Sequence, residues 1–394
     1  MLLLLFSAVC ACGQTAAPAA GLDSATADAL GTDVFLQSGS TGMVLVVVRD
    51  QQVFFHGYGE TAPGSHQVPT RDSLLRLCSL TKIFTADLLI KLVDDKTVRL
   101  DDPLQRYAPA GTVVPKRERP ITLFDLATHT SGLPREMGNA PRHTPHFTYP
   151  GFRARWRWLP NQRLRSRPGS AALYSNVAFD FLADALQSAT HKQYAALLSQ
   201  RTLIPLHMWS TTYYPTLDQC SHLLAGAHDE LACTITAATA GSSGLYSTAA
   251  DMAIWLKYLL GTGAPAIAAQ DPAAQAVYLA PSGLVSQLGL DHAGEPTGVG
   301  LGWIHILPTD SASHIVEKTG GGAGFETYIA INHAQRTAIF LAATDGPIDT
   351  HLNLFNAANK LLLAVAGLPP LPPPAPAPPP RKRAAGHRRA HHRR

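Results

Sequence analysis

Several familiar functional signatures are missing from this chain of 394 residues. Beyond its N-terminal run, no segment approaches the ~18 uninterrupted apolar residues of a membrane-spanning helix, which excludes an integral membrane domain. Its histidines include no His-Glu-x-x-His pattern, so we interpret His129 as a structural hydrogen-bonding residue. The glycines at 320–324 lack the strand–loop–helix context of a phosphate or dinucleotide site. We detect no internal repeat, and we expect no metal and no cofactor.

Charged residues are also scarce, at 15% of the chain against 46% hydrophobic residues, which is ample for a packed core. The formal net charge is +4, but residues 381–394 hold seven Lys or Arg and no acid, leaving the remainder near −3. A proline block precedes this basic end. We expect residues 368–394 to form a polyproline II spacer followed by a disordered tail.

The N-terminus reads as an export signal. Residues 1–9 are almost entirely apolar, and small residues follow them. We expect a signal peptide over 1–20, although it lacks the usual Lys or Arg before the apolar core. A lipoprotein anchored through Cys12 is the alternative. The expected location is the periplasm, with peripheral contact to the inner membrane left open.

Export makes the cysteines interpretable, because disulfides persist in oxidising compartments. Cys220 and Cys233 lie 13 positions apart in a loop-like region and are predicted to form a disulfide, which stabilises a fold by about 3 kcal/mol when unstrained. Cys78 directly precedes Ser79. We interpret it as a small buried residue rather than as a catalytic thiol.

Strand and helix patterns fall into three blocks along the chain. Residues 42–48 and 52–55 are β-branched and aromatic runs that predict a hairpin. The middle, about 83–240, favours helices. Strand-like segments follow at 301–306, 328–331 and 338–342, before a final helix at 352–365. This arrangement predicts an α/β (α+β) fold with one antiparallel sheet built from both ends of the chain, flanked by helices and interrupted by an inserted all-helical region.

Three short motifs, each occurring once, point to chemistry: Ser79-Leu80-Thr81-Lys82, Tyr174-Ser175-Asn176 and Lys318-Thr319-Gly320. Each motif alone is weak evidence for an active site, but the order and wide spacing of all three together indicate one. A serine hydroxyl needs a base before it can attack a carbonyl. A lysine three residues later shares its helical face, and burial or a second cation lowers its pKa into a useful range.

The other two motifs supply complementary groups. A tyrosine between two ammonium groups can relay a proton, and an asparagine amide can bond both a lysine and a substrate carbonyl. Lys318 and Thr319 would hold a substrate carboxylate. The glycines after them allow a peptide to lie along a strand edge. The competing interpretations, a helix cap, a buried tyrosine and a glycine-rich turn, explain each motif singly but not all three together.

Together these motifs resemble the serine β-lactamase/penicillin-binding protein family, of the class C type in which Tyr-x-Asn is the second motif. Family-typical stretches also occur at 128–134, 244–248 and 300–303, and the similarity spans roughly 35–365. The resemblance implies a β-lactamase/transpeptidase-like fold over residues 21–367. Within the family the chain most resembles the D-alanyl-D-alanine carboxypeptidase/endopeptidase members.

The resemblance also implies a role for each motif. Ser79 would be the nucleophile, and Lys82 with Tyr174 would act as the base. The backbone N–H groups of Ser79 and Gly321 would form the oxyanion hole. The residues implied to bind substrate are Asn176, Lys318, Thr319 and Gly320.

The implied function is a serine D,D-peptidase that forms an acyl-enzyme with peptidoglycan stem peptides and is acylated by β-lactams. The alternative of the same fold is a class C β-lactamase or a small-ester hydrolase, which deacylation rate and pocket shape would distinguish. A binding protein that uses its basic tail to contact anionic lipid or wall polymer is the alternative of another class. We expect no nucleic-acid partner for an exported chain.

If the tail only tethers the enzyme, deleting 368–394 leaves turnover of soluble peptides unchanged. Steady-state kinetics of the truncated and full chains on one peptide would test this. A large loss of turnover in the truncated chain would contradict tethering as the role of the tail.

Overall fold

The computed structural model describes residues 21–138, 140–228, 233–263, 269–290, 293–306, 313–346 and 354–371. The expected signal peptide at 1–20 lies outside the described residues, as does the tail from residue 372 onward. None of the helices in the described part is long and apolar enough to cross a membrane.

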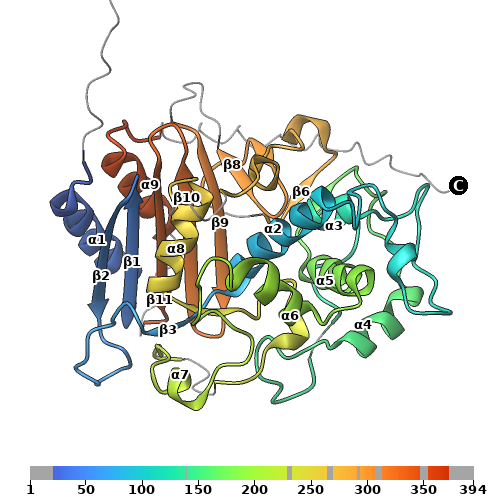
Figure 1. The fold of residues 1–394 in the computed structure, drawn as a ribbon, viewed down its shortest axis with the longest axis horizontal. Coiled ribbons are helices and arrows are strands. Elements are labelled where there is room, and N and C mark those ends of the chain that lie inside the picture. The colour runs from blue at the N-terminus through green and yellow to red at the C-terminus, as the bar shows by residue number, and fades with distance from the viewer. Residues whose placement is uncertain are drawn as a thin grey trace, which may run out of the picture.

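A seven-stranded antiparallel sheet lies at the centre, in the order β2-β1-β11-β10-β9-β8-β7 (Figure 1). The strands are β1 (Gly42–Arg49), β2 (Gln52–Gly59), β7 (Gly298–Val299), β8 (Ile304–Ile306), β9 (Ile315–Gly322), β10 (Phe325–Asn332) and β11 (Thr337–Thr344). β1 pairs with β11, so that Met43 lies opposite Ala343 and Arg49 opposite Thr337. The predicted hairpin and the sheet built from both chain ends are therefore confirmed.

The valine run of β1 is explained by burial on both faces of the sheet. Because side chains alternate along a strand, neighbouring residues point into different cores. One core receives Val44, Val46 and Val48. The other receives Met43, Leu45 and Val47. A strand buried on both sides needs apolar residues at every position, which is why the sequence shows a continuous run rather than an alternation.

Helices α1 (Ser24–Ser38) and α9 (Leu354–Val365) contact each other and pack on one face of the sheet. Sequence patterning does not predict α1, because its buried positions are mostly small, Ala27 and Gly31 among them. Gly31 is required by close packing: a Cβ there would lie 2.1 Å from Oη of Tyr58. The Asp23 side chain caps this helix by accepting from the N–H groups of Ala25 and Thr26.

The opposite face carries α8 (Ala249–Leu259) and α2 (Thr81–Asp94), beyond which the inserted region extends (Figure 1). Its helices are α3 (Leu123–Ala127), α4 (Phe152–Trp158), α5 (Asn176–Thr190), α6 (Tyr194–Leu198) and α7 (Leu217–Ser221). Short 3-10 or π turns are η1 (Cys78–Leu80), η2 (Leu104–Tyr107), η3 (Leu159–Asn161), η4 (Ser199–Leu203), η5 (Ala237–Thr239), η6 (Pro272–Gln275) and η7 (Pro281–Gly283). Almost every residue of α2 is buried, so this helix forms the centre of the larger core.

Two small sheets accompany the large one and add strands that the sequence patterns do not predict. β3 (Leu74–Arg76) pairs antiparallel with β5 (Tyr246–Thr248). β4 (Ala172–Leu173), which lies within the insertion, pairs parallel with β6 (Gln287–Leu288), which follows the insertion in the chain. These strands have two or three residues each, and their partners lie far along the chain. No local periodicity can reveal such a pairing, so the insertion is mainly rather than entirely helical.

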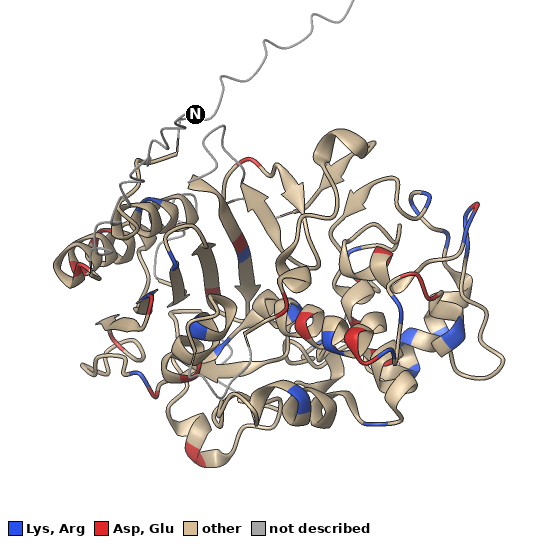
Figure 2. Ribbon diagram, turned by 45° about the horizontal axis from the view of Figure 1, so that its top comes forward, with Lys and Arg blue, Asp and Glu red and all other residues tan. Residues whose placement is uncertain are grey.

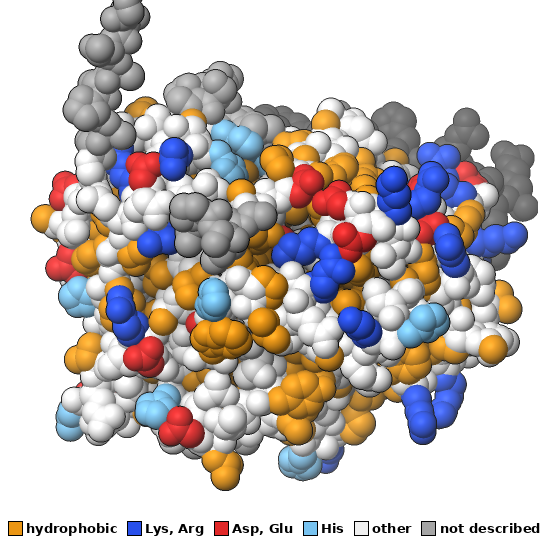
Figure 3. All heavy atoms as spheres, in the orientation of Figure 1, with side chains coloured by type: hydrophobic (Ala, Val, Ile, Leu, Met, Phe, Trp, Pro, Cys, Tyr) orange, Lys and Arg blue, Asp and Glu red, His pale blue; other side chains and the backbone are white. Residues whose placement is uncertain are grey.

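Exposed basic side chains gather at the end of the inserted region, within residues 116–167 (Figures 2 and 3). They include Lys116, Arg117, Arg153, Arg157, Arg163, Arg165 and Arg167. The acids of the same stretch are Glu118, Asp125 and Glu136, and Asp125 is buried beneath Arg119. The body of the protein is therefore polarised, although its formal net charge without the tail is slightly negative.

The packed chain continues a few residues beyond α9. The N–H of Leu368 donates to the carbonyl of Leu363 at 2.8 Å, and Leu368 and Leu371 pack against the core formed by α1, α9 and the sheet. Packing thus extends past residue 367, the expected domain end.

We therefore predict that a chain ending at residue 367 is less stable than one ending at residue 371, by about 1–2 kcal/mol in the free energy of unfolding, because two half-buried leucines are lost. Denaturant titrations of the two truncated chains would measure the difference. Equal midpoints and slopes would show that these leucines contribute nothing.

Candidate active site

The three sequence motifs converge on Ser79, which sits in the 3-10 turn η1 just before α2. Oη of Tyr174 donates to Oγ of Ser79 at 2.7 Å. Nζ of Lys82, in the first turn of α2, donates to the same oxygen at 3.2 Å. The serine hydroxyl thus lies within hydrogen-bond reach of two groups able to accept its proton.

The turn that presents Ser79 is strained and braced from both sides. Cys78 adopts a φ of 51°, a left-handed conformation that costs energy for a residue with a side chain. The N–H of Leu77 donates to the carbonyl of Leu245 at 2.9 Å, and Oγ1 of Thr327 on β10 donates to the carbonyl of Leu77 at 3.0 Å. Cys78 is fully buried, in agreement with its interpretation as a packing residue.

Lys82 is completely buried and donates three hydrogen bonds. Besides Ser79, its Nζ reaches Oδ1 of Asn176 at 2.6 Å and the carbonyl oxygen of Ser242 at 2.8 Å. Burial lowers the pKa of Lys82 below its usual range, and the positive charge of Lys318 lowers it further, while Tyr174 acts in the opposite direction. A lysine with a lowered pKa can accept a proton near neutral pH, as a general base must.

The ring of Tyr174 is surrounded by positive charge. The ring centroid lies 4.8 Å from Nζ of Lys82, 5.4 Å from Nζ of Lys318 and 4.6 Å from Cζ of Arg135. Coulomb attraction to these cations favours negative charge on the phenol oxygen that bonds Ser79. The arrangement suits a tyrosine that takes up and returns a proton.

His129 supports Tyr174 from behind. The two rings stack with their centroids 4.4 Å apart, and Nδ1 of His129 accepts from the N–H of Ser175 at 3.1 Å. Burial holds the pKa of His129 well below its usual range, with the charges of Lys82 and Lys318 contributing. The ring is therefore neutral and structural, as expected. Within the described residues no group of three or more His, Cys, Asp or Glu is placed to hold a metal.

Asn176 is the first residue of α5, a position that fixes its amide. Oγ of Ser175 caps the helix by accepting from the N–H of Ala178 at 3.0 Å, and donates to the carbonyl of Pro134 at 2.7 Å. With its oxygen bound to Lys82, Asn176 turns its Nδ2 toward Oε1 of Glu136 at 2.5 Å. The amide therefore links the base to the rim of the site.

The third motif lies on β9, next to the nucleophile turn. The Lys318 residue is buried, and its Nζ donates to the carbonyl of Thr319 at 2.8 Å. Gly320 is required by the packing: a Cβ there would lie 3.0 Å from the backbone nitrogen of Ser79. Gly321 follows on the same strand and is exposed. Its N–H therefore belongs to the strand that packs next to the Ser79 turn.

The residues near the site that the motifs do not predict include Arg135, Ser242, Asp180 and Glu136. Ser242 contributes its carbonyl to Lys82 and a side-chain hydrogen bond to Asp180, and the sequence carries no signal for either contact. Asp180 lies one helical turn after Asn176 on the same face of α5, a spacing that the sequence does show. Burial raises the pKa of Asp180 to about 7, while Arg155 acts in the opposite direction.

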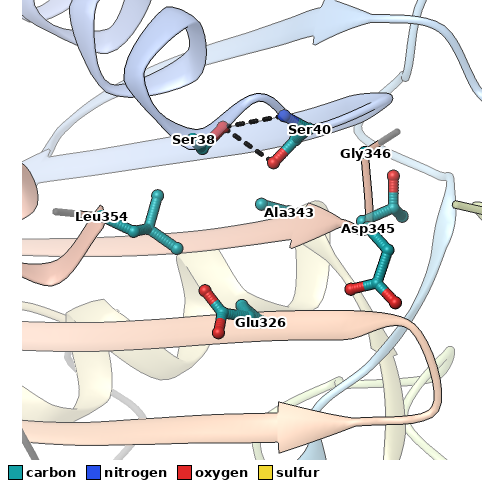
Figure 4. Close-up of a pocket in the computed structure, with 8 residues that line it drawn as sticks. Ser38, Ser40, Glu326, Ala343, Asp345, Gly346 and Leu354 are labelled. Atoms are coloured by element: carbon teal, nitrogen blue, oxygen red, sulfur yellow. Dashed lines mark hydrogen bonds between the residues drawn. The ribbon is translucent and has the colours of Figure 1, made fainter. Parts of the chain in front are cut away.

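A cavity of about 280 Å³ opens beside Asn176. Its lining includes Glu136, Phe147, Asn176, Asp180, Ser242 and Ser243. A second cavity, at the end of the sheet between Ser38, Glu326 and Leu354, holds only about 10 Å³ (Figure 4). That volume is about the space of a single water molecule, so of these two cavities the first is the one that can admit part of a substrate.

The predicted partners Cys220 and Cys233 are joined, with their sulfur atoms 2.09 Å apart. Cys220 belongs to the short helix α7, whose first turn is capped by Thr216. The bond therefore ties this helix to the chain entering η5.

Comparison with known proteins agrees with this geometry. The beta-lactamase family model matches residues 22–379. The D-alanyl-D-alanine-carboxypeptidase/endopeptidase AmpH of Escherichia coli (strain K12) is 40% identical over 376 residues, covering 93% of this chain and 98% of that protein. The structure of a beta-lactamase/D-alanine carboxypeptidase from Yersinia pestis, complexed with citrate, superposes with a TM-score of 0.83 at 40% identity, covering 87% of this chain and 98% of its own. A class C beta-lactamase, 20% identical with a TM-score of 0.68 over 86% of this chain and 95% of its own, shares the fold.

The raised pKa of Asp180 predicts a pH-dependent gain of stability in Asp180→Asn. The folded protein favours the protonated carboxyl, whereas the unfolded chain ionises it above its usual value of 3.8. Wild-type stability contributed by this proton is therefore lost as pH rises toward 7. Asparagine does not titrate, so the stability difference between variant and wild type should grow by about 2 kcal/mol from pH 5 to pH 8.

Denaturant titrations at both pH values would measure this difference, with the exposed Asp218→Asn as the matched control. A difference for Asp180→Asn that stays constant with pH would contradict a raised pKa of Asp180 in the folded protein.

Proposed function

The chain belongs to the beta-lactamase family, and from this premise we propose that it is a serine-type D-alanyl-D-alanine carboxypeptidase and endopeptidase that acts on peptidoglycan stem peptides. The observation that carries the proposal is the pair of hydrogen bonds to Oγ of Ser79, from Lys82 and from Tyr174. A relative 40% identical over nearly its whole length, named for this activity, supports the substrate class.

The reaction follows from the contacts of Ser79. A peptide lying along β9 would place its terminal carboxylate near Lys318 and Thr319, and its last peptide carbonyl above Ser79. As Oγ attacks that carbonyl carbon, its proton passes to Lys82 or Tyr174. The N–H groups of Ser79 and Gly321 would stabilise the oxyanion that forms.

Collapse of this intermediate breaks the peptide bond and leaves an ester on Ser79. The departing amine takes up the proton, and Tyr174 is placed to deliver it because its Oη lies 2.7 Å from Oγ. Water then attacks the ester by the same route, which restores the serine hydroxyl and releases the shortened peptide. Cross-link cleavage differs only in having a larger leaving amine.

β-Lactams would acylate Ser79 because their strained amide presents the same carbonyl to the same groups. A class C beta-lactamase shares the fold at 20% identity, a level that supports the architecture and not the activity. The relative and the structure that are 40% identical both carry the carboxypeptidase name. The peptidase is therefore the function that we put forward, with β-lactam or ester hydrolysis as its rival.

We place the enzyme in the periplasm, where its substrate lies. The apolar N-terminal run supports export, and the polybasic end beyond residue 380 supports peripheral contact with anionic membrane or wall polymer.

The proposal predicts that muropeptides lose a terminal D-alanine, or lose cross-links, only when Ser79 is present. Mass spectrometry of pentapeptide and cross-linked muropeptides would compare the wild type with Ser79→Ala and with Ser221→Ala, an exposed serine on α7 as control. We expect products with the wild type and the control, and a loss of at least about 10³-fold in rate for Ser79→Ala.

Intact muropeptides in every sample, combined with turnover of a chromogenic cephalosporin by the wild type, would favour the β-lactamase alternative. Products in the Ser79→Ala sample would remove Ser79 from the reaction.

A further inference from the structure

Positive charge in the body of the protein is concentrated in the inserted region. Residues 116–167 hold eleven Lys or Arg and three acids, a formal net charge of +8, whereas the whole chain carries +4. Two of these arginines are neutralised locally, because Arg119 pairs with the buried Asp125 and Arg155 pairs with Asp184. Exposed basic side chains of the same stretch gather at one end of the molecule (Figures 2 and 3).

We call this surface the basic face, and it consists of the exposed Lys and Arg residues at 116–117, 153–157 and 163–167. Glu118 is an exposed acid among them, and it pairs with Arg167 at 3.2 Å. Four members of the face have no ion pair within the described part of the chain: Arg153, Arg157, Arg163 and Arg165. Like charges gathered on one surface repel, so an anion bound there stabilises the arrangement.

Specific contacts hold the parts of the basic face in place. Nη1 of Arg117 donates to the carbonyl oxygens of Leu164 and Arg165, at 3.3 and 3.0 Å. The 163–167 segment also packs tightly on the loop that follows α3, because a Cβ on Gly132 would lie 2.5 Å from the carbonyl oxygen of Ser166. The face is therefore anchored to the fold rather than carried on a free loop.

The basic face is continuous with the active site through the same loop. The N–H of Arg165 donates to the carbonyl of Gly132 at 2.8 Å, and further along the N–H of Leu173 donates to the carbonyl of His129 at 2.8 Å. The next residue is Tyr174, which bonds the nucleophile. The segment that begins in the basic face thus runs along the active-site loop until it reaches the reacting groups.

Exposed positive charge is also present at the active site itself. Arg135 lies on the same loop, is exposed, and has its Cζ 4.6 Å from the ring centroid of Tyr174. A substrate that carries several negative charges would therefore meet cations at the active site and again on the neighbouring basic face.

The residue types of the insertion indicate which anion suits this surface. Ten of the eleven basic residues in 116–167 are arginine. A guanidinium presents parallel donors that match the two oxygens of a carboxylate. The proposed function, on which this step rests, supplies that group, since each uncleaved stem peptide ends in the carboxylate of a D-alanine. Peptidoglycan carries many stems on one polymer and is therefore a repeating source of carboxylates.

We propose that the basic face is a second binding surface for peptidoglycan, which holds the carboxylates of neighbouring stems while one stem is attacked at Ser79. Several weak contacts to one polymer raise the effective concentration of the next stem at the active site. A short soluble peptide fills the active site alone and gains nothing from the face. The basic tail is a poor occupant because it carries the same sign of charge.

The first test measures binding to purified sacculi by co-sedimentation. One variant of the full-length mature protein, Arg157→Gln/Arg163→Gln/Arg165→Gln, removes three charges from the basic face. The matched control, Arg71→Gln/Lys192→Gln/Lys360→Gln, removes three exposed charges elsewhere. Each is made in a Ser79→Ala background so that the sacculi stay intact, and all retain the tail.

We expect the basic-face variant to bind sacculi about tenfold more weakly than the Ser79→Ala parent, the scale of three lost exposed ion contacts. The control should bind as the parent does. Added salt should screen the contacts and reduce the difference. Sacculi whose carboxylates have been converted to amides should bind the parent and the basic-face variant equally weakly.

The second test measures catalysis with Ser79 restored. The ratio of the turnover of sacculi to the turnover of a soluble pentapeptide should fall about tenfold in the basic-face variant, following the loss of affinity, and should be preserved in the control. Because the ratio is taken within each protein, a variant with a smaller folded fraction gives the same value.

The outcomes separate this inference from the proposed function. If the wild type processes neither sacculi nor the pentapeptide, the D,D-peptidase proposal fails, while co-sedimentation still decides the basic face. If the basic-face variant keeps both its affinity for sacculi and its turnover ratio, the second surface is overturned. Two further results would also overturn it: equal discrimination between the proteins by amidated and untreated sacculi, or a loss of binding to phosphatidylglycerol vesicles with binding to sacculi unchanged.

Discussion

Nζ of Lys82 is the point at which three distant segments of this protein meet. It bonds the nucleophile turn through Ser79, the start of α5 through Asn176, and the loop before β5 through the carbonyl of Ser242. An amine buried to this degree must be satisfied by good acceptors, because an unsatisfied buried charge is strongly destabilising. The requirement ties the nucleophile turn, the start of α5 and the loop before β5 to one another, and so positions Ser79.

The site also collects features that oppose stability. Cys78 holds a left-handed backbone, Lys82 and Lys318 are buried amines, and Asp180 is a buried acid whose Oδ1 has no hydrogen-bond partner among the described residues. Each of these is costly in a folded protein and is tolerated because the surrounding core over-determines its position. Their clustering around one serine is what distinguishes this end of the sheet from the small cavity near Glu326. The active site of this protein is therefore the place where strained backbone and buried ionisable groups are found together.

Much of this architecture could be predicted from sequence, because strong local signals coincide with it. The valine run of β1 and the strands at 325–332 and 337–344 are long and apolar, and the three motifs identify Ser79, Tyr174 and Lys318. The two-residue strand β4 and the small-residue helix α1 carry too little periodicity to be found. The spacing of Asp180 from Asn176 places both residues on one face of α5, which the sequence does show. The burial of Asp180 near Lys82 depends on tertiary packing, which sequence spacing does not predict.

The pairing of β1 with β11 has a consequence for how this protein is made. β1 is synthesised early, yet the strand that covers its edge and the helix α9 that covers one face come from the last part of the chain. Contacts of such long sequence separation form late and make folding slow. During synthesis the valine-rich edge of β1 that pairs with β11 therefore stays unpaired until the last strands are made. An exposed apolar edge of this kind is prone to aggregation and favours binding by chaperones. The third motif lies on β9, so a translation product that ends before β9 lacks Lys318 and Thr319 and cannot assemble the complete site.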